Sequence, residues 1–415
     1  MWQTGSPVPK DDETVRPFKI AIDDKILVDL KQRLANTRIQ ESIPGVNFEY
    51  GFPSSQLKQV VDYWSNKYDW RKEEKKLNQY NHFKTQIEGL DINFMHIKPK
   101  QTAGGKAIPL LLVHGWPGSF AEYMKMIPLL TEGPGVNFEL VIPSMPGYGF
   151  SEAAHKPGLG LPHVSRIMVK LMKRLGHEKF MFQGGDWGAG VGALIAAFFP
   201  QNVIGLHTNF AMVSLGVRDW LRLVVADLGF PSLVFQDPEN EVKRMNPLSK
   251  CIFNVLNEWG YSHIQMTKPD SVGAGLNDSP AGMAAYILEK FSTWTNSANT
   301  GKADGGLLEK FTMDELLTNV MIYWVNGNMA SSQRLYKESV ATLSLNFMIR
   351  VPYAVLAGRH ELPFSAPKTI IQNRAPMLVQ YADAESGGHF LQMEEPKLVA
   401  DDIRLFYSSI VKNEK

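Results

Sequence analysis

The chain has 415 residues, of which 44% are hydrophobic and 20% are charged, and its formal net charge is +1. A chain of this length and apolar content can bury a large core, and its length suggests two or three domain-sized units. The near-zero net charge gives no sign of a nucleic-acid partner or of attraction to an anionic membrane surface. Cys251 is the single cysteine, which excludes an internal disulfide and fits a reducing compartment.

Sequence motifs for metals, nucleotides and membranes are missing. No cysteine and histidine cluster has zinc-binding spacing, and the glycine motifs of phosphate-binding and dinucleotide-binding loops are not present. Residues 1–16 resemble neither a signal peptide nor a membrane span. The most apolar window, residues 191–199, is far shorter than the roughly 20 residues that a spanning helix needs. As written, the chain is predicted to be soluble and to need no metal or cofactor.

Residues 1–100 are predicted to form an N-terminal extension unit. Asp23 or Asp24 can cap a helix whose leucines and isoleucines recur at helical spacing, and a second helix is expected over residues 55–68. Residues 82–97 alternate apolar and polar side chains around a Glu-Gly pair, which predicts a β-hairpin.

From residue 108, strand-like and helix-like segments alternate, which predicts a mostly parallel sheet covered by helices. Between residues 213 and 345 the pattern becomes helical and rich in aromatic side chains, and we interpret this region as a lid over the strand ends. We therefore expect a hydrolase core at 101–212 and 346–415, interrupted by the lid at 213–345. Strands are expected at 109–113, 140–143, 179–182, 203–208, 351–357 and 378–382, and helices at 121–130, 164–175, 281–294, 313–324 and 398–411.

The turn at residues 183–190 reads Gln-Gly-Gly-Asp-Trp-Gly-Ala-Gly and lies between a strand and a helix of small residues. This is the pattern of the nucleophile elbow of α/β-hydrolases, with Asp186 where serine usually stands. A carboxylate is already anionic at neutral pH and suits displacement at a saturated carbon, which leaves an alkyl-enzyme ester for water to hydrolyse. Taken alone, the same residues also fit an ordinary turn.

A base and an acid follow in the order expected for this fold. His389 lies in a Gly-Gly-His-Phe turn after the last predicted strand, where the catalytic histidine belongs. Glu361 follows the strand at 351–357 and is our choice for the acid that orients the imidazole. Asp383 and Glu385 are rivals by spacing, although they lie too close before His389 to reach back to its ring.

Two backbone N–H groups are predicted to form an oxyanion hole. Trp116 lies in a His-Gly-Trp-Pro loop after the first core strand, and Trp187 directly follows the elbow aspartate. Such N–H groups would stabilise the oxyanion that forms when water attacks the ester. The loop by itself also fits a simple Gly-Pro turn.

Together these motifs resemble the epoxide hydrolases of the microsomal type. The resemblance rests on His-Gly-Trp-Pro at 114–117, Gly-Gly-Asp-Trp-Gly at 184–188 and Gly-Gly-His-Phe at 387–390. It extends through the lid, at 260–265, 274–280, 291–295 and 331–338, and through 16–38 in the extension. Within this branch the chain resembles the animal enzymes, and its overall wording is most like that of the insect juvenile hormone epoxide hydrolases.

The resemblance implies a role for each site residue. Asp186 matches the nucleophile, His389 the base and Glu361 the acid, while Tyr261 and Tyr336 match two lid tyrosines that hold and protonate the epoxide oxygen. Two phenols suit that task because ring opening generates an alkoxide, which is a poor leaving group.

The implied substrate is a small apolar epoxide, with water as the second reactant and no cofactor, metal or nucleic acid. Juvenile hormone catabolism is the expected role, and general detoxification of epoxides is the alternative. Two other hypotheses for the function are a haloalkane dehalogenase and a non-catalytic carrier of hydrophobic ligands. The family resemblance also implies the endoplasmic reticulum membrane, reached through an anchor that these 415 residues lack and that we expect to have been removed, with the cytosol as the alternative.

Overall fold

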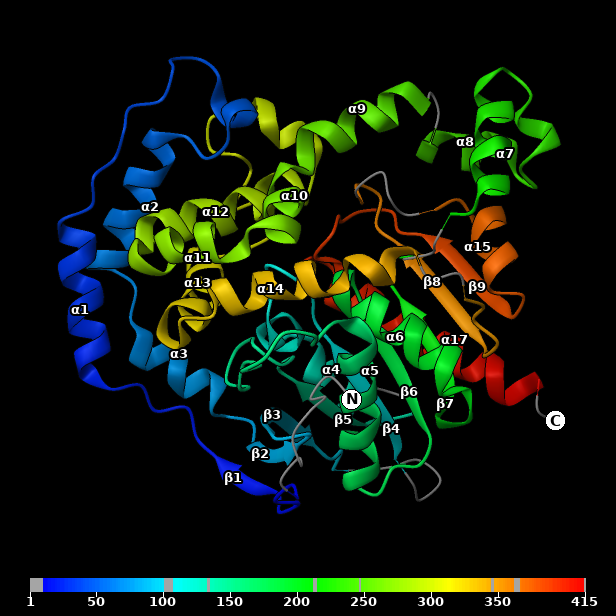
Figure 1. The fold of residues 1–415 in the computed structure, drawn as a ribbon, viewed down its shortest axis with the longest axis horizontal. Helices are drawn as coiled ribbons and strands as arrows, with labels where there is room; N and C mark the ends of the chain where they lie inside the picture. The colour runs from blue at the N-terminus through cyan, green and yellow to red at the C-terminus, as the bar shows by residue number, and fades with distance from the viewer. Residues whose placement is uncertain are drawn as a thin grey trace.

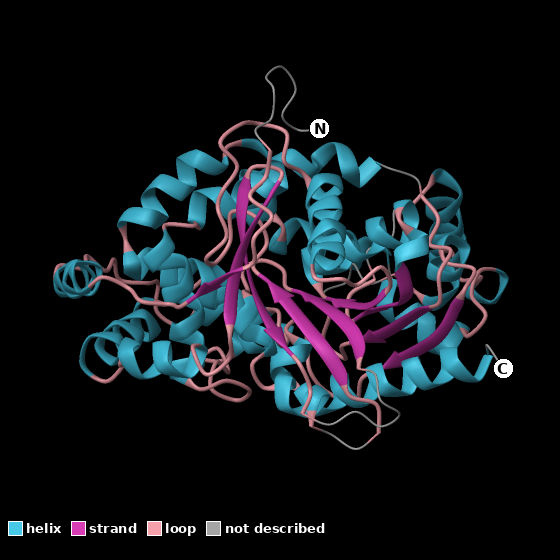
Figure 2. Ribbon diagram, turned by 90° about the horizontal axis from the view of Figure 1, so that it is seen from below, coloured by secondary structure: helices cyan, strands magenta, loops and turns pink. Residues whose placement is uncertain are grey.

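The computed structural model describes residues 10–100, 107–132, 135–211, 215–245, 248–344, 347–361 and 366–413. Within these ranges the strands form one nine-stranded sheet in the order β1-β2-β3-β5-β4-β6-β7-β8-β9. Figure 2 shows this sheet as a twisted layer with helices on both sides. The strands are β1 Arg16–Phe18, β2 His82–Ile87, β3 Leu90–Ile97, β4 Ile108–Val113, β5 Phe138–Pro143, β6 Phe180–Gly184, β7 Val203–Thr208, β8 Tyr353–Ala357 and β9 Leu378–Asp383.

From β5 to β9 all neighbouring strands run parallel, as the alternation of strands and helices predicted. Every residue of β6 and β8 is buried, which is why β8 and the first three residues of β6 are apolar. The predicted α/β-hydrolase fold with a mostly parallel sheet is therefore confirmed.

The predicted hairpin is present as β2 and β3, and it belongs to the same sheet as the core. β3 pairs antiparallel with β5, with Phe94 opposite Pro143 and Ile97 opposite Leu140. The expected boundary near residue 100 thus falls between two strands of one continuous sheet. The short strand β1, which the sequence analysis did not predict, extends the sheet by pairing with β2.

Helices cover both faces of the parallel part. Figure 1 shows α5 and α6 in front of the sheet and α17 behind it. The helix expected over 121–130 is instead divided into a short 3₁₀ turn, Phe120–Tyr123, and α4. Pro128 explains the division, because in one continuous helix it would lack an N–H and clash with the preceding turn. The core helices are α4 Met126–Thr131, α5 Leu161–Arg174, α6 Asp186–Phe198, α15 Lys368–Arg374, α16 Leu391–Glu394 and α17 Pro396–Asn413.

The segment between β7 and β8 is helical, as expected for the lid. Its helix α13 begins at a capping box formed by Thr312 and Glu315 and ends at Gly327, which has the left-handed conformation. The lid helices are α7 Val217–Asp227, α8 Pro238–Met245, α9 Leu248–Glu258, α10 Gly260–Thr267, α11 Pro269–Asp278, α12 Pro280–Thr293, α13 Met313–Asn326 and α14 Met329–Ser339.

The N-terminal helices pack against the lid rather than against the sheet (Figure 1). They are α1 Asp24–Ala35, which Asp23 caps as predicted, α2 Ser54–Asn66 and α3 Trp70–Leu77. The Arg33 guanidinium pairs with Asp278 of α11 at 2.7 Å, and the Tyr63 hydroxyl donates to Asp314 of α13 at 2.9 Å. The extension therefore contacts both the core sheet and the lid. No helix in the described part of the chain is long and apolar enough to cross a membrane.

Candidate active site

Asp186 lies at a strained turn between β6 and α6. Its φ is +47°, in a region that residues other than glycine rarely adopt. The turn is possible because its neighbours are small: a Cβ on Gly188 would lie 1.9 Å from the carbonyl oxygen of Val113. Strain of this kind persists only where the surrounding structure enforces it, and it holds the carboxylate at the carboxyl end of the sheet.

The backbone N–H of Trp116 donates to Oδ1 of Asp186 at 2.8 Å. The two groups approach closely because Gly115 has no side chain; a Cβ there would lie 2.4 Å from the same oxygen. Trp116 thus contacts Asp186 as an oxyanion-hole donor would. For Trp187, the other predicted donor, the described part of the structure contains no hydrogen bond to Asp186, so its role stays a prediction.

Lid helix α13 holds the loop that carries Trp116. The Asn319 side chain donates to the Pro117 carbonyl at 2.7 Å and accepts from the Ser119 hydroxyl at 2.8 Å. The Tyr323 hydroxyl donates to the Gly118 carbonyl at 2.7 Å. All of these polar groups are buried, so each bond satisfies a backbone or side-chain group that water does not reach.

His389 lies between two carboxylates. Its Nδ1 is 2.8 Å from Oε1 of Glu361, and its Nε2 is 3.5 Å from Oδ2 of Asp186. Burial by itself lowers the pKa of His389, but the charges and hydrogen bonds of Glu361 and Asp186 outweigh it and raise the pKa well above its usual value. Asp383 and Glu385, the rival acids, are exposed to solvent.

The backbone around His389 is held by groups that the sequence analysis missed. The N–H of His389 donates to the Trp294 carbonyl at the end of α12, at 3.0 Å. Glu394 accepts from the N–H groups of Gly388 and Phe390, at 2.8 and 3.0 Å. Burial raises the pKa of Glu394 to about 8. No sequence signal points to this role, because a glutamate near a helix end is ordinarily a surface residue.

Glu122 is a second buried carboxyl that the sequence analysis missed. Its side chain accepts a hydrogen bond from Gln392, and burial raises its pKa to about 8. A protonated Glu122 adds no further negative charge near Asp186 and Glu361. While Glu122 is protonated, the pKa of His389 is set mainly by Glu361 and Asp186, the two carboxylates that the imidazole contacts.

Tyr261 and Tyr336 come from lid helices α10 and α14, lie side by side, and are close enough to Asp186 to be influenced by its charge. Their ring centroids are 5.9 Å apart, the Tyr261 ring stacks on Trp116 at 5.1 Å, and the Tyr336 ring meets Trp187 edge-on at 4.7 Å. Burial first, and then the nearby charge of Asp186, raises the pKa of the Tyr261 phenol; burial, Tyr261 and Asp186 do the same for Tyr336. Both phenols therefore keep their protons near neutral pH.

The Tyr336 hydroxyl is buried without a well-formed hydrogen bond to any described residue. The Tyr261 phenol is its polar neighbour, and an epoxide oxygen placed between the two phenols would accept the hydrogen bond that Tyr336 can donate. The five side chains singled out from the sequence thus converge on one place. They define an α/β-hydrolase with a carboxylate at its elbow and two lid phenols near it.

Comparisons with known proteins agree with this class. The family model described as "Epoxide hydrolase N terminus" matches residues 15–123, and the one described as "alpha/beta hydrolase fold" matches residues 108–396. The chain is 47% identical to juvenile hormone epoxide hydrolase 2 of Ctenocephalides felis, over 97% of this chain and 87% of that protein. It is 45% identical to epoxide hydrolase 1 of Sus scrofa, over 98% of this chain and 91% of that protein.

Solved structures of epoxide hydrolases also match along almost the whole chain. The crystal structure of juvenile hormone epoxide hydrolase from Bombyx mori has a TM-score of 0.93 and 43% identity, over 98% of this chain and 96% of that one. The epoxide hydrolase of Aspergillus niger has a TM-score of 0.79 and 26% identity, over 96% and 97%. The chain belongs to the epoxide hydrolase family, in its microsomal-type branch, and is an epoxide hydrolase.

Proposed function

We propose that the chain hydrolyses apolar epoxides to vicinal diols in two steps, through an ester of Asp186. One observation carries the proposal: Asp186 lies beside His389 and near the phenols of Tyr261 and Tyr336, which come from the lid. A nucleophile, a base and two acids are thereby available around one small space.

In the first step an oxygen of Asp186 attacks one oxirane carbon and the carbon–oxygen bond breaks. The electron pair goes to the epoxide oxygen, which Tyr261 and Tyr336 hold by hydrogen bonds and which takes a proton from one phenol. The product is an alkyl ester of Asp186, and the displaced oxygen becomes the first hydroxyl of the diol.

In the second step His389, oriented by Glu361, takes a proton from water, and the hydroxide attacks the ester carbonyl carbon. The Trp116 N–H holds the oxyanion. When the intermediate collapses, the second diol oxygen leaves with the proton from His389. The proton on the regenerated Asp186 carboxyl restores the ionised phenol, so one water is consumed for each epoxide.

The proposed substrate is a juvenile hormone, a terpenoid ester with an epoxide. Support comes from the apolar, aromatic walls of the site, which include Trp116, Trp187 and Trp294, and from the relatives that carry this name. General detoxification of epoxides is the competing role, because the porcine epoxide hydrolase 1 is about as similar. A large preference in kcat/KM for one substrate class would decide between the two roles.

A single turnover in ¹⁸O-water, with enzyme in excess, tests the chemistry. A juvenile hormone and styrene oxide are used in parallel. The first diol formed should contain no label, and Asp186 should acquire label over repeated turnovers. Label in the first diol would mean that water attacks the epoxide directly and would overturn the role of Asp186.

Two further parts of the proposal have their own tests. The haloalkane dehalogenase reading predicts displacement of halide that does not depend on Tyr336, whereas epoxide opening should collapse in Tyr336→Phe. The carrier hypothesis predicts binding without turnover.

The proposed location is the endoplasmic reticulum membrane, which the family resemblance implies; recovery of the native protein in the cytosolic fraction would contradict it.

A further inference from the structure

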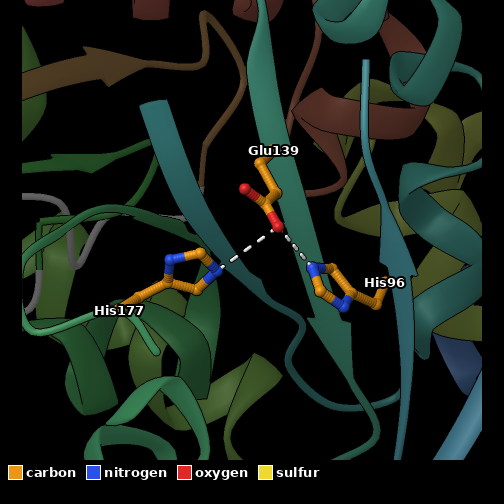
Figure 3. A group of neighbouring side chains, drawn as sticks. All are labelled: His96, Glu139 and His177. Atoms are coloured by element: carbon orange, nitrogen blue, oxygen red, sulfur yellow. Dashed lines mark hydrogen bonds and ion pairs between the residues drawn. The ribbon is translucent and has the colours of Figure 1, made fainter. Parts of the chain in front are cut away.

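A second group of titratable side chains lies at the amino ends of the parallel strands, whereas the catalytic residues lie at their carboxyl ends. His96 is near the end of β3, Glu139 is near the start of β5, and His177 follows α5. Figure 3 shows both imidazoles pointing a ring nitrogen at the same carboxylate from different sides. Nε2 of His96 lies 2.7 Å from Oε1 of Glu139, and Nε2 of His177 lies 3.5 Å from that oxygen. The proposed reaction uses none of these residues.

The three ligand atoms are close enough to bind one metal ion. They all lie within 4.8 Å of one another. Zinc binds histidine nitrogen and carboxylate oxygen at roughly 2.0–2.2 Å, so ligand atoms on a tetrahedral ion are about 3.4 Å apart. The 3.5 Å separation already fits. The 2.7 Å separation has to open by under about 1 Å, which small rotations of the side chains supply.

The surroundings also suit a bound ion. The side chains of His96, Glu139 and His177 are each 14% exposed, so the group is shielded but still open to entry from solvent. The buried Nε2 of His177 has no well-formed hydrogen bond within the described ranges. Zinc is commonly four-coordinate, and it accepts two histidines and one glutamate as ligands with water in the fourth position.

We propose that His96, Glu139 and His177 form a zinc-binding site that joins the N-terminal hairpin to the core sheet. The ligands come from β3, from β5 and from the chain just after α5, and β3–β5 is the junction between the extension and the core. The spacing of cysteines and histidines in the sequence predicted no zinc site, because these three ligands are far apart in the chain and only the fold brings them together.

The site is separate from the catalytic one. Glu139 is paired with Pro109 near the start of β4, whereas the loop of Trp116 follows the end of that strand at Val113. The intervening strand rises by about 13 Å. Zinc bound here should therefore stabilise the fold and leave the turnover of epoxides unchanged.

Two local features set the conditions for binding. The hydrogen bond between His96 and Glu139 places a proton between the two groups. Zinc bound at Nε2 of His96 would send that proton to Nδ1 of the same ring or to water. The Lys98 ammonium lies 3.8 Å from the same Glu139 oxygen and competes with the ion, but its side chain is 73% exposed and can turn away. Removing Lys98 should therefore tighten zinc binding.

The test uses the full chain, stripped with a chelator and dialysed against a low micromolar zinc buffer. The wild type should retain one zinc more than Glu139→Gln or His177→Asn, as measured by mass spectrometry of the metal. With zinc at 100 times its Kd, the Tm of the wild type should rise by about 3 °C, and the Tm of those variants should not. Cobalt(II) should give the intense visible absorption of a four-coordinate site in the wild type alone.

Controls separate this site from other histidines and from loss of folding. His155→Asn removes an exposed histidine that contacts Glu152, and it should keep the zinc. Lys98→Met should lower the zinc Kd several-fold, a gain that damage to the fold cannot produce. Unchanged turnover of styrene oxide identifies variants that are folded. Equal zinc content in wild type and Glu139→Gln, or no zinc in the wild type, would overturn the proposal.

Discussion

Trp116 and Asp186 are joined by a 2.8 Å hydrogen bond that makes the two oxygens of the carboxylate different. Oδ1 accepts from the Trp116 N–H, and Oδ2 lies 3.5 Å from Nε2 of His389. An oxygen already held by an oxyanion-hole donor is suited to become the carbonyl oxygen of the ester. We therefore infer that Oδ2 forms the bond to the substrate carbon.

Replacing His389 with glutamine should separate the two chemical steps. A carboxylate nucleophile has no proton for a base to remove in the first step, so alkylation should continue while hydrolysis of the ester stops. Mass spectrometry of the intact protein should then show an adduct with the mass of the epoxide. Asp186→Asn is the matched control: it should give no adduct and lose on the order of 10⁴-fold or more in kcat. An adduct-free His389→Gln that still binds substrate would contradict the ester mechanism.

Removing either lid phenol should slow formation of the ester. Tyr261→Phe and Tyr336→Phe should each reduce the single-turnover rate by about 10²–10⁴, because general acid catalysis contributes that much. Tyr286→Phe is a control from the same cluster, since its ring lies 5.7 Å from Trp116 and its hydroxyl contacts Gln265. Stopped-flow measurement of tryptophan fluorescence would follow the step. A loss in Tyr286→Phe equal to that in Tyr336→Phe would show that the effect is one of packing.

The pH dependence of ester hydrolysis should shift when Glu361 is neutralised. Hydrolysis needs His389 without its proton, so the rate should rise with pH through the pKa of His389. Glu361 and Asp186 raise that pKa, and Asp186 loses its charge in the ester. In Glu361→Gln the rising limb should move to lower pH, while the maximum rate falls by about 10²–10⁴. A limb that stays in place would exclude His389 as the titrating base.

The buried carboxyl of Glu122 should make the fold less stable at alkaline pH. Burial raises its pKa from 4.5 to about 8, so the folded state binds a proton that the unfolded state has released. Stability should therefore fall as the pH rises from about 4.5 to 8, by at most about 1.4 kcal/mol per pH unit. Glu122→Gln keeps an acceptor for Gln392 and should reduce this slope. Urea titrations at several pH values would measure it, and an unchanged slope would refute the assignment.

Asn319 should act as a positioning residue for the oxyanion-hole loop. Asn319→Leu removes two buried hydrogen bonds to the loop of Trp116, at a cost of roughly 1–3 kcal/mol for each polar group left unsatisfied. If the loop shifts, kcat should fall while the KM for substrate changes little. Asn326→Leu in the same helix, where the side chain bonds only within α13, is the control. Equal kinetics in both variants would show that the loop needs no support from the lid.

Much of this architecture could be predicted from sequence, because its signals are local. The elbow needs small residues around Asp186, the buried strands are continuous apolar runs, and the hairpin of β2 and β3 alternates around its turn. Resemblance to a family singled out Tyr261 and Tyr336, since nothing in the local sequence separates them from other tyrosines.

Features that depend on contacts between distant segments could not be predicted in this way. Glu394 and Glu122 look like surface glutamates until the fold buries them beside His389. His96, Glu139 and His177 lie on three separate elements and have no characteristic spacing. The division of the helix expected over 121–130 could have been predicted, because Pro128 disfavours a continuous helix there.

The extension spans the molecule: its strands belong to the core sheet, and its helices are fastened to the lid through Arg33 and Tyr63. It thus acts as a brace between the two parts that enclose Asp186. A lid braced in this way cannot lift off the core as a rigid body without breaking those contacts. Local movement of lid segments away from the extension breaks none of those contacts, so the rate of epoxide and diol exchange should depend on lid segments that the extension does not touch.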